Sequence, residues 1–445
     1  MKTLFLSLGM LALISGSIMA QSVSFSAKPQ KPLIPEGETH AHVLLRLKAA
    51  GAPDDEQPKK LNLALVIDRS GSMRGQKIID ARNSAIKMIE KMRDGDTVSV
   101  ISYSDDVRVD VEPSQLNDAA RVKIEAIVHT IGENGSTNLG GGLVKGIEKA
   151  KQNLKKAEVS RVLLISDGLA NRGVTDPAAL NKISRESLQS GVVVTTLGLG
   201  VDYNEDLMTS VADNGGGNYY FIEKSDQIVA TLNQELSQMA KTVGKGLQCQ
   251  NKLAAGVSLE EMYGWIFKTE GAEVQASFGE IFADQHRTVL CKFKLPDGLK
   301  KGQQVQIHPF VLRYTETLDG KEVRRQVKTE PIQLRVTDDG NAVLTAQDME
   351  VTARIAEIQL ATRLENVAKL VQEGKFSEAK ELIHKAVQSA KEDQASIPKE
   401  YLDRLMRATE DAEQLVGDVD RAEESVYERK KVMKNSKSKS YMFKK

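Results

Sequence analysis

The chain has 445 residues, the length of about two to four domains at roughly 150 residues each. Its 61 basic and 61 acidic residues balance, which argues against dedicated nucleic-acid binding. The only cysteines are Cys249 and Cys291, so the chain is not a small domain held together by disulfides.

The first residues have the pattern of a segment that directs export. A basic start precedes an apolar run over 4–14 and a stretch of small or neutral residues. We therefore expect a secretory signal peptide over residues 1–20, cleaved after Ala20, with a cut after Ser17 as the alternative. An uncleaved anchor is disfavoured, because the run is shorter than the ~20 residues that span a bilayer. No other stretch is apolar and long enough to cross a membrane, so we expect a periplasmic or secreted protein without a transmembrane segment.

Residues 21–60 begin with strands. Apolar residues alternate over 23–27 and again over 41–47, on either side of a turn at 35–37. Alternation of this kind predicts two half-buried strands. The polar stretch 51–60 then reads as a linker.

From 61 to 242, strand and helix patterns alternate, which predicts a parallel sheet covered on both faces. The expected strands are 61–67, 97–103, 107–111, 161–166 and 192–200, and the expected helices are 76–92, 122–131 and 139–154. Because 107–111 follows 97–103 after a short connection, this pair should be a hairpin with an antiparallel edge strand.

Polar residues follow the first of these strands directly, in the order Asp68-Arg69-Ser70-Gly71-Ser72. They lie where the carboxyl end of a strand meets a helix, the usual ligand crevice of an open α/β sheet. One carboxylate and two hydroxyls are the hard oxygen ligands that Mg²⁺ prefers. Alone the pattern is weak, since Ser and Gly are ordinary turn residues.

Two later segments strengthen it, because Thr137 opens the helix 139–154 and Asp167 ends the strand 161–166. Together these positions resemble, in type and order, the metal-ion-dependent adhesion site of von Willebrand factor type A (VWA) domains: Asp68, Ser70, Ser72, Thr137 and Asp167. The resemblance covers residues 61–242 and extends to 192–200 and Tyr219-Tyr220-Phe221. It implies an α/β fold with a doubly wound, mostly parallel, Rossmann-like sheet.

The resemblance also implies a mode of binding. Ser70, Ser72 and Thr137 would coordinate the ion directly, and Asp68 and Asp167 would act largely through ordered water. Mg²⁺ is the expected ion, with Mn²⁺ or Ca²⁺ as alternatives. An Asp or Glu carboxylate from a protein partner would complete the coordination shell.

Residues 245–340 alternate with a period of two and carry turn residues at 296–298, 319–320 and 339–340, which indicates an antiparallel β-sandwich. Strands from 21–50 should complete it, so that the VWA domain is an insertion. This architecture resembles bacterial exported VWA proteins of the calcium-activated chloride channel homolog type. Cys249 and Cys291 fall on inward-facing positions, and a disulfide and two buried thiols are equally compatible with the sequence.

Residues 345–436 have helical periodicity, with a turn at 373–376 and a further helix over 398–416, which predicts a helical hairpin or bundle. The basic end, 437–445, is expected to be a disordered, solvated tail, with contact to an envelope surface as the alternative.

These features favour an exported, non-enzymatic binding protein that holds a protein partner through the metal site. A structural or chaperone-like subunit of an envelope complex, with a structural metal, is the first alternative. A metal-dependent hydrolase is the second. It is disfavoured because phosphatases with an Asp nucleophile carry a second Asp two residues on, where this chain has Ser70, and because no Gly-x-Ser-x-Gly motif is present.

Overall fold

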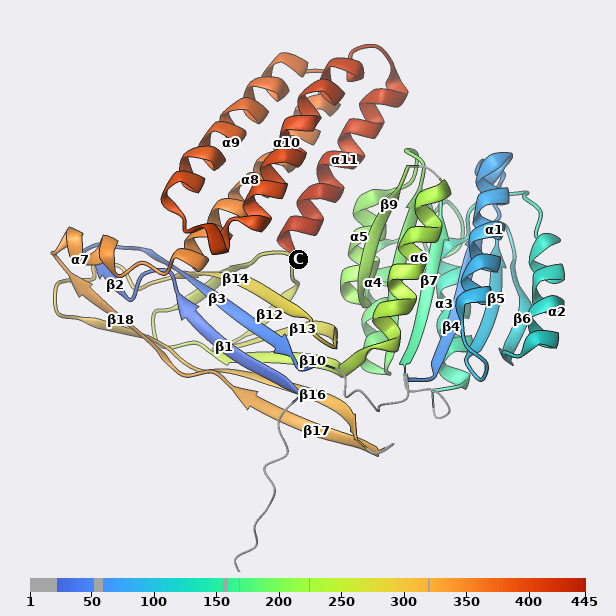
Figure 1. The fold of residues 1–445 in the computed structure, drawn as a ribbon, viewed down its shortest axis with the longest axis horizontal. Helices are drawn as coiled ribbons and strands as arrows, with labels where there is room; N and C mark the ends of the chain where they lie inside the picture. The colour runs from blue at the N-terminus through green and yellow to red at the C-terminus, as the bar shows by residue number, and fades with distance from the viewer. Residues whose placement is uncertain (1–21, 52–58, 155–158, 168, 224, 319–320) are drawn as a thin grey trace, which may run out of the picture.

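The computed structural model describes residues 22–51, 59–154, 159–167, 169–223, 225–318 and 321–445. The expected signal peptide, residues 1–20, lies outside these ranges. An α/β domain stands beside a β-sandwich, and a bundle of long helices packs on the sandwich (Figure 1). In the described part of the chain, no helix combines the length and apolar character that crossing a bilayer requires.

The α/β domain is built on one six-stranded sheet with the order β6-β5-β4-β7-β8-β9. Its strands are β4 (Leu61–Asp68), β5 (Thr97–Tyr103), β6 (Val107–Gln115), β7 (Val159–Ser166), β8 (Val192–Leu199) and β9 (Gly216–Ile222). All neighbours are parallel except β5 and β6, which confirms the predicted antiparallel edge. Strands β4, β7 and β8 are buried along their whole length, as expected for a sheet covered on both faces.

Helices cover both faces of this sheet. One apolar cluster joins the sheet to α1 (Gln76–Lys91), α2 (Asp118–His129) and α6 (Ser225–Ala240). A second joins the opposite face to α3 (Leu139–Gln152), α4 (Pro177–Gln189) and α5 (Glu205–Asn214). Helix α2 begins earlier than the apolar pattern indicates, because the Asn117 side chain caps it by accepting a hydrogen bond from the Ala120 N–H.

The sandwich consists mainly of a four-stranded sheet, β1-β3-β14-β11, and a five-stranded sheet, β12-β13-β10-β16-β17. Strand β3 lies between β1 and β14 and pairs with β14 over nine residues, so a strand that precedes the α/β domain pairs with one that follows it, as the alternation predicts. The bounds of the strands are β1 (Val23–Pro29), β3 (His40–Ala49), β10 (Thr242–Lys252), β11 (Ser258–Met262), β12 (Phe267–Glu270), β13 (Glu273–Phe282), β14 (His286–Lys294), β16 (Phe310–Leu318) and β17 (Lys321–Lys328).

A third sheet departs from the expected antiparallel pattern. It has the order β15-β18-β2, from β15 (Gln304–Ile307), β18 (Ile332–Thr337) and β2 (Leu33–Pro35), and β2 runs parallel to β18. Strand β2 has only three residues, too few for the alternation of apolar side chains to show its direction.

The helical region contains α7 (Gly340–Thr345), α8 (Met349–Gln372), α9 (Phe376–Ser396), the short η2 (Lys399–Tyr401), α10 (Asp403–Ala422) and α11 (Val426–Lys444). The expectation of a disordered tail over 437–445 is wrong, since α11 runs to Lys444. Small or apolar side chains on one face of α11, at Val432, Ser436 and Ser440, are buried. Its lysines pair with acids of the α/β domain, which removes the charge repulsion that favours disorder.

Candidate metal site

The Asp68 side chain is fixed at the carboxyl end of β4. It is fully buried, and its Oδ1 accepts a hydrogen bond of 2.8 Å from the Ser70 N–H. The other oxygen, Oδ2, accepts one of 2.7 Å from Ser166 Oγ and one of 3.3 Å from the Tyr103 hydroxyl. Three donors, from the serine loop, β7 and β5, therefore hold this carboxylate in one orientation.

The predicted hydroxyls lie between the two predicted carboxylates. Ser70 Oγ is 3.0 Å from Ser72 Oγ, and Ser72 Oγ donates to Asp167 Oδ1 at 2.8 Å. Asp167, like Asp68, is fully buried. Hydrogen bonds thus connect Asp68, Ser70, Ser72 and Asp167 across the ends of β4 and β7, through the Ser70 backbone N–H and the two serine hydroxyls.

Thr137 reaches the same edge on a loop that is fixed by its backbone. The Thr137 N–H donates to the Asn171 side chain at 2.8 Å, and the Asn171 N–H donates to the Thr137 carbonyl at 3.2 Å. The Gly71 N–H donates to the Gly135 carbonyl at 3.0 Å, which ties this loop to the serine loop. Gly135 needs its left-handed backbone and its small size, because an added Cβ would meet the Asp105 carboxylate.

The charge of the site depends on the surroundings of Asp68 and on a lysine that contacts Asp167. Burial raises the pKa of the Asp68 carboxyl, the hydrogen bonds from Ser70 and Ser166 oppose this shift, and the nearby charge of Asp167 adds to it. Lys77, in the first turn of α1, places its Nζ 2.5 Å from Asp167 Oδ2. Sequence reasoning missed Lys77, Tyr103, Ser166 and Asn171. Each stands outside the five-residue pattern and joins the site only through the fold.

The residues present fit a hard divalent ion. Within the described ranges no group of three or more His, Cys, Asp or Glu side chains is arranged to hold a metal, so the serine and threonine hydroxyls would have to supply the remaining ligands here. What the sheet edge offers is two buried carboxylates and neighbouring hydroxyls. Two buried carboxylates repel each other unless a cation lies close to both, and oxygen ligands of this kind suit Mg²⁺.

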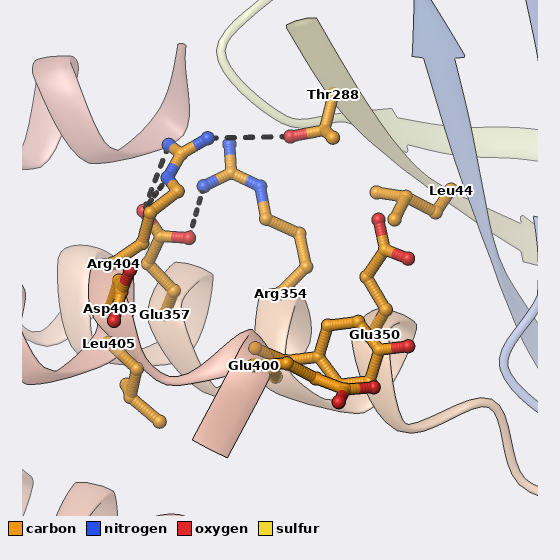
Figure 2. A pocket seen from close by; sticks show the side chains of 11 residues that line it. Leu44, Thr288, Glu350, Arg354, Glu357, Glu400, Asp403, Arg404 and Leu405 are labelled. Atoms are coloured by element: carbon orange, nitrogen blue, oxygen red, sulfur yellow. Dashed lines mark hydrogen bonds and ion pairs between the residues drawn. The ribbon is translucent and has the colours of Figure 1, made fainter. Parts of the chain in front are cut away.

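A second cluster of charged residues lines a cavity of ≈ 180 Å³ between the sandwich and the helices (Figure 2). Glu357 contacts Arg354 at 2.6 Å and accepts from Arg404 Nε at 3.0 Å. The Arg354 guanidinium also donates to the carbonyls of Phe443 and Lys444, at 2.6 and 3.0 Å. These are end carbonyls of α11 without partners inside the helix, so the arginine closes that helix end and its role is structural.

The two cysteines lie inside the sandwich core. Both are buried and both are free thiols in this structure. Burial raises the pKa of the Cys249 thiol to about 12, so very little of it is thiolate near neutral pH. Formation of a bridge to Cys291 in an oxidising compartment stays a prediction.

The α/β domain is similar to domains of known proteins. Residues 62–235 match the family model of the von Willebrand factor type A domain. The chain is 30% identical over 233 residues to the uncharacterized protein YfbK of Escherichia coli, covering 52% of this chain and 40% of that protein. It is 28% identical over 284 residues to the uncharacterized protein sll0103 of Synechocystis, covering 61% of this chain and 66% of that protein. The chain thus spans less than two thirds of either relative.

Two solved structures share the fold across nearly the whole chain. A von Willebrand factor type A protein from Catenulispora acidiphila superposes with a TM-score of 0.68 at 14% identity and covers 91% of each chain. The ArnB paralog VWA2 from Sulfolobus acidocaldarius superposes with a TM-score of 0.60 at 22% identity, covering 94% of this chain and 99% of that chain. Residues 62–235 therefore form a VWA domain. A human relative at this domain, at 30% identity over 174 residues and 19% of its length, is inter-alpha-trypsin inhibitor heavy chain H1.

Proposed function

We propose that this protein is an exported, non-enzymatic binding protein whose VWA domain holds a protein partner through Mg²⁺. The observation that carries the proposal is the convergence of buried Asp68 and Asp167 with the Ser70 and Ser72 hydroxyls at one sheet edge. Thr137, on the adjoining loop, is the fifth proposed ligand.

The ion would supply an electrophilic point at the surface that favours an anionic oxygen, and an Asp or Glu side chain of the partner would provide it. Side chains of this protein hold the proposed ligands in position. Ser166 and Tyr103 hold Asp68 in place, and Ser72 orients Asp167. The ligands that would bind the ion directly, Ser70, Ser72 and Thr137, are neutral, so the ion itself would stay electrophilic toward a carboxylate of the partner.

The contacts of the two carboxylates support binding over hydrolysis. Asp68 bonds to serines and a tyrosine, and Asp167 bonds to Ser72 and Lys77. Neither contact set contains a histidine or a second carboxylic acid placed to move a proton during catalysis.

A capture experiment with the mature full-length chain tests the proposal. Bait protein is incubated with an envelope extract in Mg²⁺ or in EDTA, and Asp68→Ala is compared with Asp118→Ala, which changes an exposed carboxylate on α2. We expect a partner that is retained by wild type and Asp118→Ala in Mg²⁺, and is lost in EDTA and with Asp68→Ala.

A partner that persists in EDTA would favour a structural subunit instead. Hydrolysis of phosphate esters or peptides by the purified chain in Mn²⁺, lost in Asp68→Ala, would favour the enzymatic alternative.

A further inference from the structure

Lys77 is a cation that the structure places directly on a proposed metal ligand. Its Nζ lies 2.5 Å from Asp167 Oδ2, while the other oxygen of Asp167 accepts from Ser72 Oγ at 2.8 Å. Asp167 is fully buried, and the Lys77 side chain is 34% exposed. Both oxygens of this carboxylate are therefore engaged, one by a hydroxyl and one by an ammonium group.

The position of Lys77 on its helix is unfavourable for a positive charge. It is the second residue of α1, within the first turn, where the helix dipole is positive. The helix N-cap is Gly75, which has no side chain to compensate the charge. The favourable interaction of the ammonium group therefore comes from Asp167.

The loop after β8 also lies close to the end of the lysine side chain. A Cβ added at Gly200, just after β8, would lie 3.5 Å from Lys77 Cε and 3.7 Å from its Nζ. The end of the side chain is thus close both to this backbone and to Asp167. Its contact with the carboxylate is part of the packing of the site and not a surface ion pair with free movement.

We propose that the Lys77 ammonium is a built-in competitor of the divalent ion: it neutralises Asp167 in the metal-free protein and must give up this carboxylate when the ion binds. The inference rests on the proposed metal site. Two carboxylates give the site two negative charges, and Lys77 already balances one of them. A divalent ion at the same edge would meet that positive charge within a few ångströms, where the repulsion of like charges is strong.

The consequence is a weakened affinity for the ion. Displacing Lys77 offsets part of the attraction between the carboxylates and Mg²⁺. The fraction of the site occupied by the ion would therefore follow the external Mg²⁺ concentration. In its absence, Lys77 would keep Asp167 from remaining buried and unpaired, which is strongly unfavourable.

Calorimetric titration of the mature full-length protein with MgCl₂ tests this without a partner. The variants are Lys77→Gln, which removes the charge, and Lys77→Arg, which retains it. The control is Lys87→Gln, which removes an exposed positive charge from the same helix. We expect Lys77→Gln to bind Mg²⁺ about tenfold more tightly, equal to about 1.4 kcal/mol. Lys77→Arg and Lys87→Gln should stay within about twofold of wild type.

Thermal melts supply a second measurement. In EDTA, Lys77→Gln should melt below wild type, and MgCl₂ should raise its melting temperature by more than it raises that of wild type. Measurable binding by Lys77→Gln where wild type shows none would also support the competition.

Equal or weaker Mg²⁺ binding by Lys77→Gln, with wild type binding the ion, would overturn the role of Lys77 and leave the metal site standing. Absence of binding in both proteins would overturn the metal site and this inference together.

Discussion

Asp68 matters for the proposed metal site and little for the folding of the domain. Its carboxylate collects three hydrogen bonds at the site, whereas the packing of β4 comes from buried apolar residues such as Leu63, Leu65 and Ile67. We expect Asp68→Ala to abolish Mg²⁺ binding and to leave the domain folded. Calorimetric titration and circular dichroism would measure the two effects.

The same variant should lose the stabilisation that Mg²⁺ gives to wild type, which reaches about 2.7 kcal/mol at a hundredfold excess of ion over its dissociation constant. Thr137→Ala should be milder for the ion and severe for the partner. If Mg²⁺ leaves the melting temperature of the wild type unchanged, the five-residue motif has only a structural role.

Glu205 predicts a pH dependence outside the metal site. Burial raises its pKa from 4.5 to about 7, and Lys434 at 3.7 Å and the Tyr219 hydroxyl only partly oppose the shift. Burial lowers the pKa of Lys434 as well, so the pair does not compensate the burial of either group. The folded state therefore binds a proton at Glu205 that the unfolded state releases.

Stability from this group is full below the unfolded pKa of 4.5 and is lost as the pH rises to about 7. Urea denaturation of wild type between these pH values should show a decline that is absent in Glu205→Gln. Identical slopes for the two proteins would contradict the assignment.

At the scale of elements, the sequence contained most of the α/β domain and all five proposed metal ligands, because buried parallel strands are continuous apolar runs and the ligands follow them directly. The last part of helix α11, residues 437–444, was missed because its informative pattern is polar. Lys430, Lys434, Lys437 and Tyr441 recur every three or four residues, the spacing of one helix face. Their partners, among them Asp202, Asp206 and Asp213, are more than two hundred residues away in sequence.

The other unpredicted residues have the same explanation. Lys77 and Asp167 are 90 positions apart in sequence, and Ser166 and Asp68 are 98 apart. No local sequence pattern therefore predicts either contact. The sequence shows which residues end each strand. The contacts of Lys77 and Ser166 form only once the fold brings distant segments, among them strands β4 and β7, next to each other.

Tyr441 should be the residue that holds α11 against the VWA domain. Its hydroxyl donates to Asp213 at 2.9 Å, and its ring packs edge-on to Tyr219 with centroids 5.6 Å apart. We expect Tyr441→Ala to lower the free energy of unfolding by about 2–4 kcal/mol and to speed proteolysis within α11. Tyr427→Ala, at a position 51% exposed on the same helix, should stay within about 0.5 kcal/mol of wild type. Equal effects of the two changes would remove this role.

At the scale of the whole molecule, a buried ionic group joins the VWA domain to the sandwich. Arg161 of β7 pairs with Glu235 of α6 and with Glu280 of β13, and all three are buried. Asn218 and the Tyr220 hydroxyl also donate to Glu235. The two domains are therefore joined by a buried cluster in which Arg161 is the positive charge between two carboxylates.

Arg161→Met should destabilise the chain by about 3–5 kcal/mol, because it leaves two buried carboxylates without their partner. Adding Glu235→Gln and Glu280→Gln to Arg161→Met should recover part of the loss by removing those charges. Denaturant unfolding of the three proteins would measure this. A triple variant less stable than Arg161→Met would show that the charges are not the cause.

The insertion of the VWA domain determines how a pulling force would pass from it to the sandwich. The domain begins at Leu61 of β4 and ends at Ala240 of α6, and a single residue then separates α6 from β10. The first residue of β4 and the last of α6 both lie at the end of the sheet opposite Asp68 and Asp167 (Figure 1). Tension applied by a captured ligand would run lengthwise through the sheet and divide between two covalent tethers. The sandwich would take up that load through β3 and β10, which lie in different sheets, so force would reach both layers at once and neither strand would carry it alone.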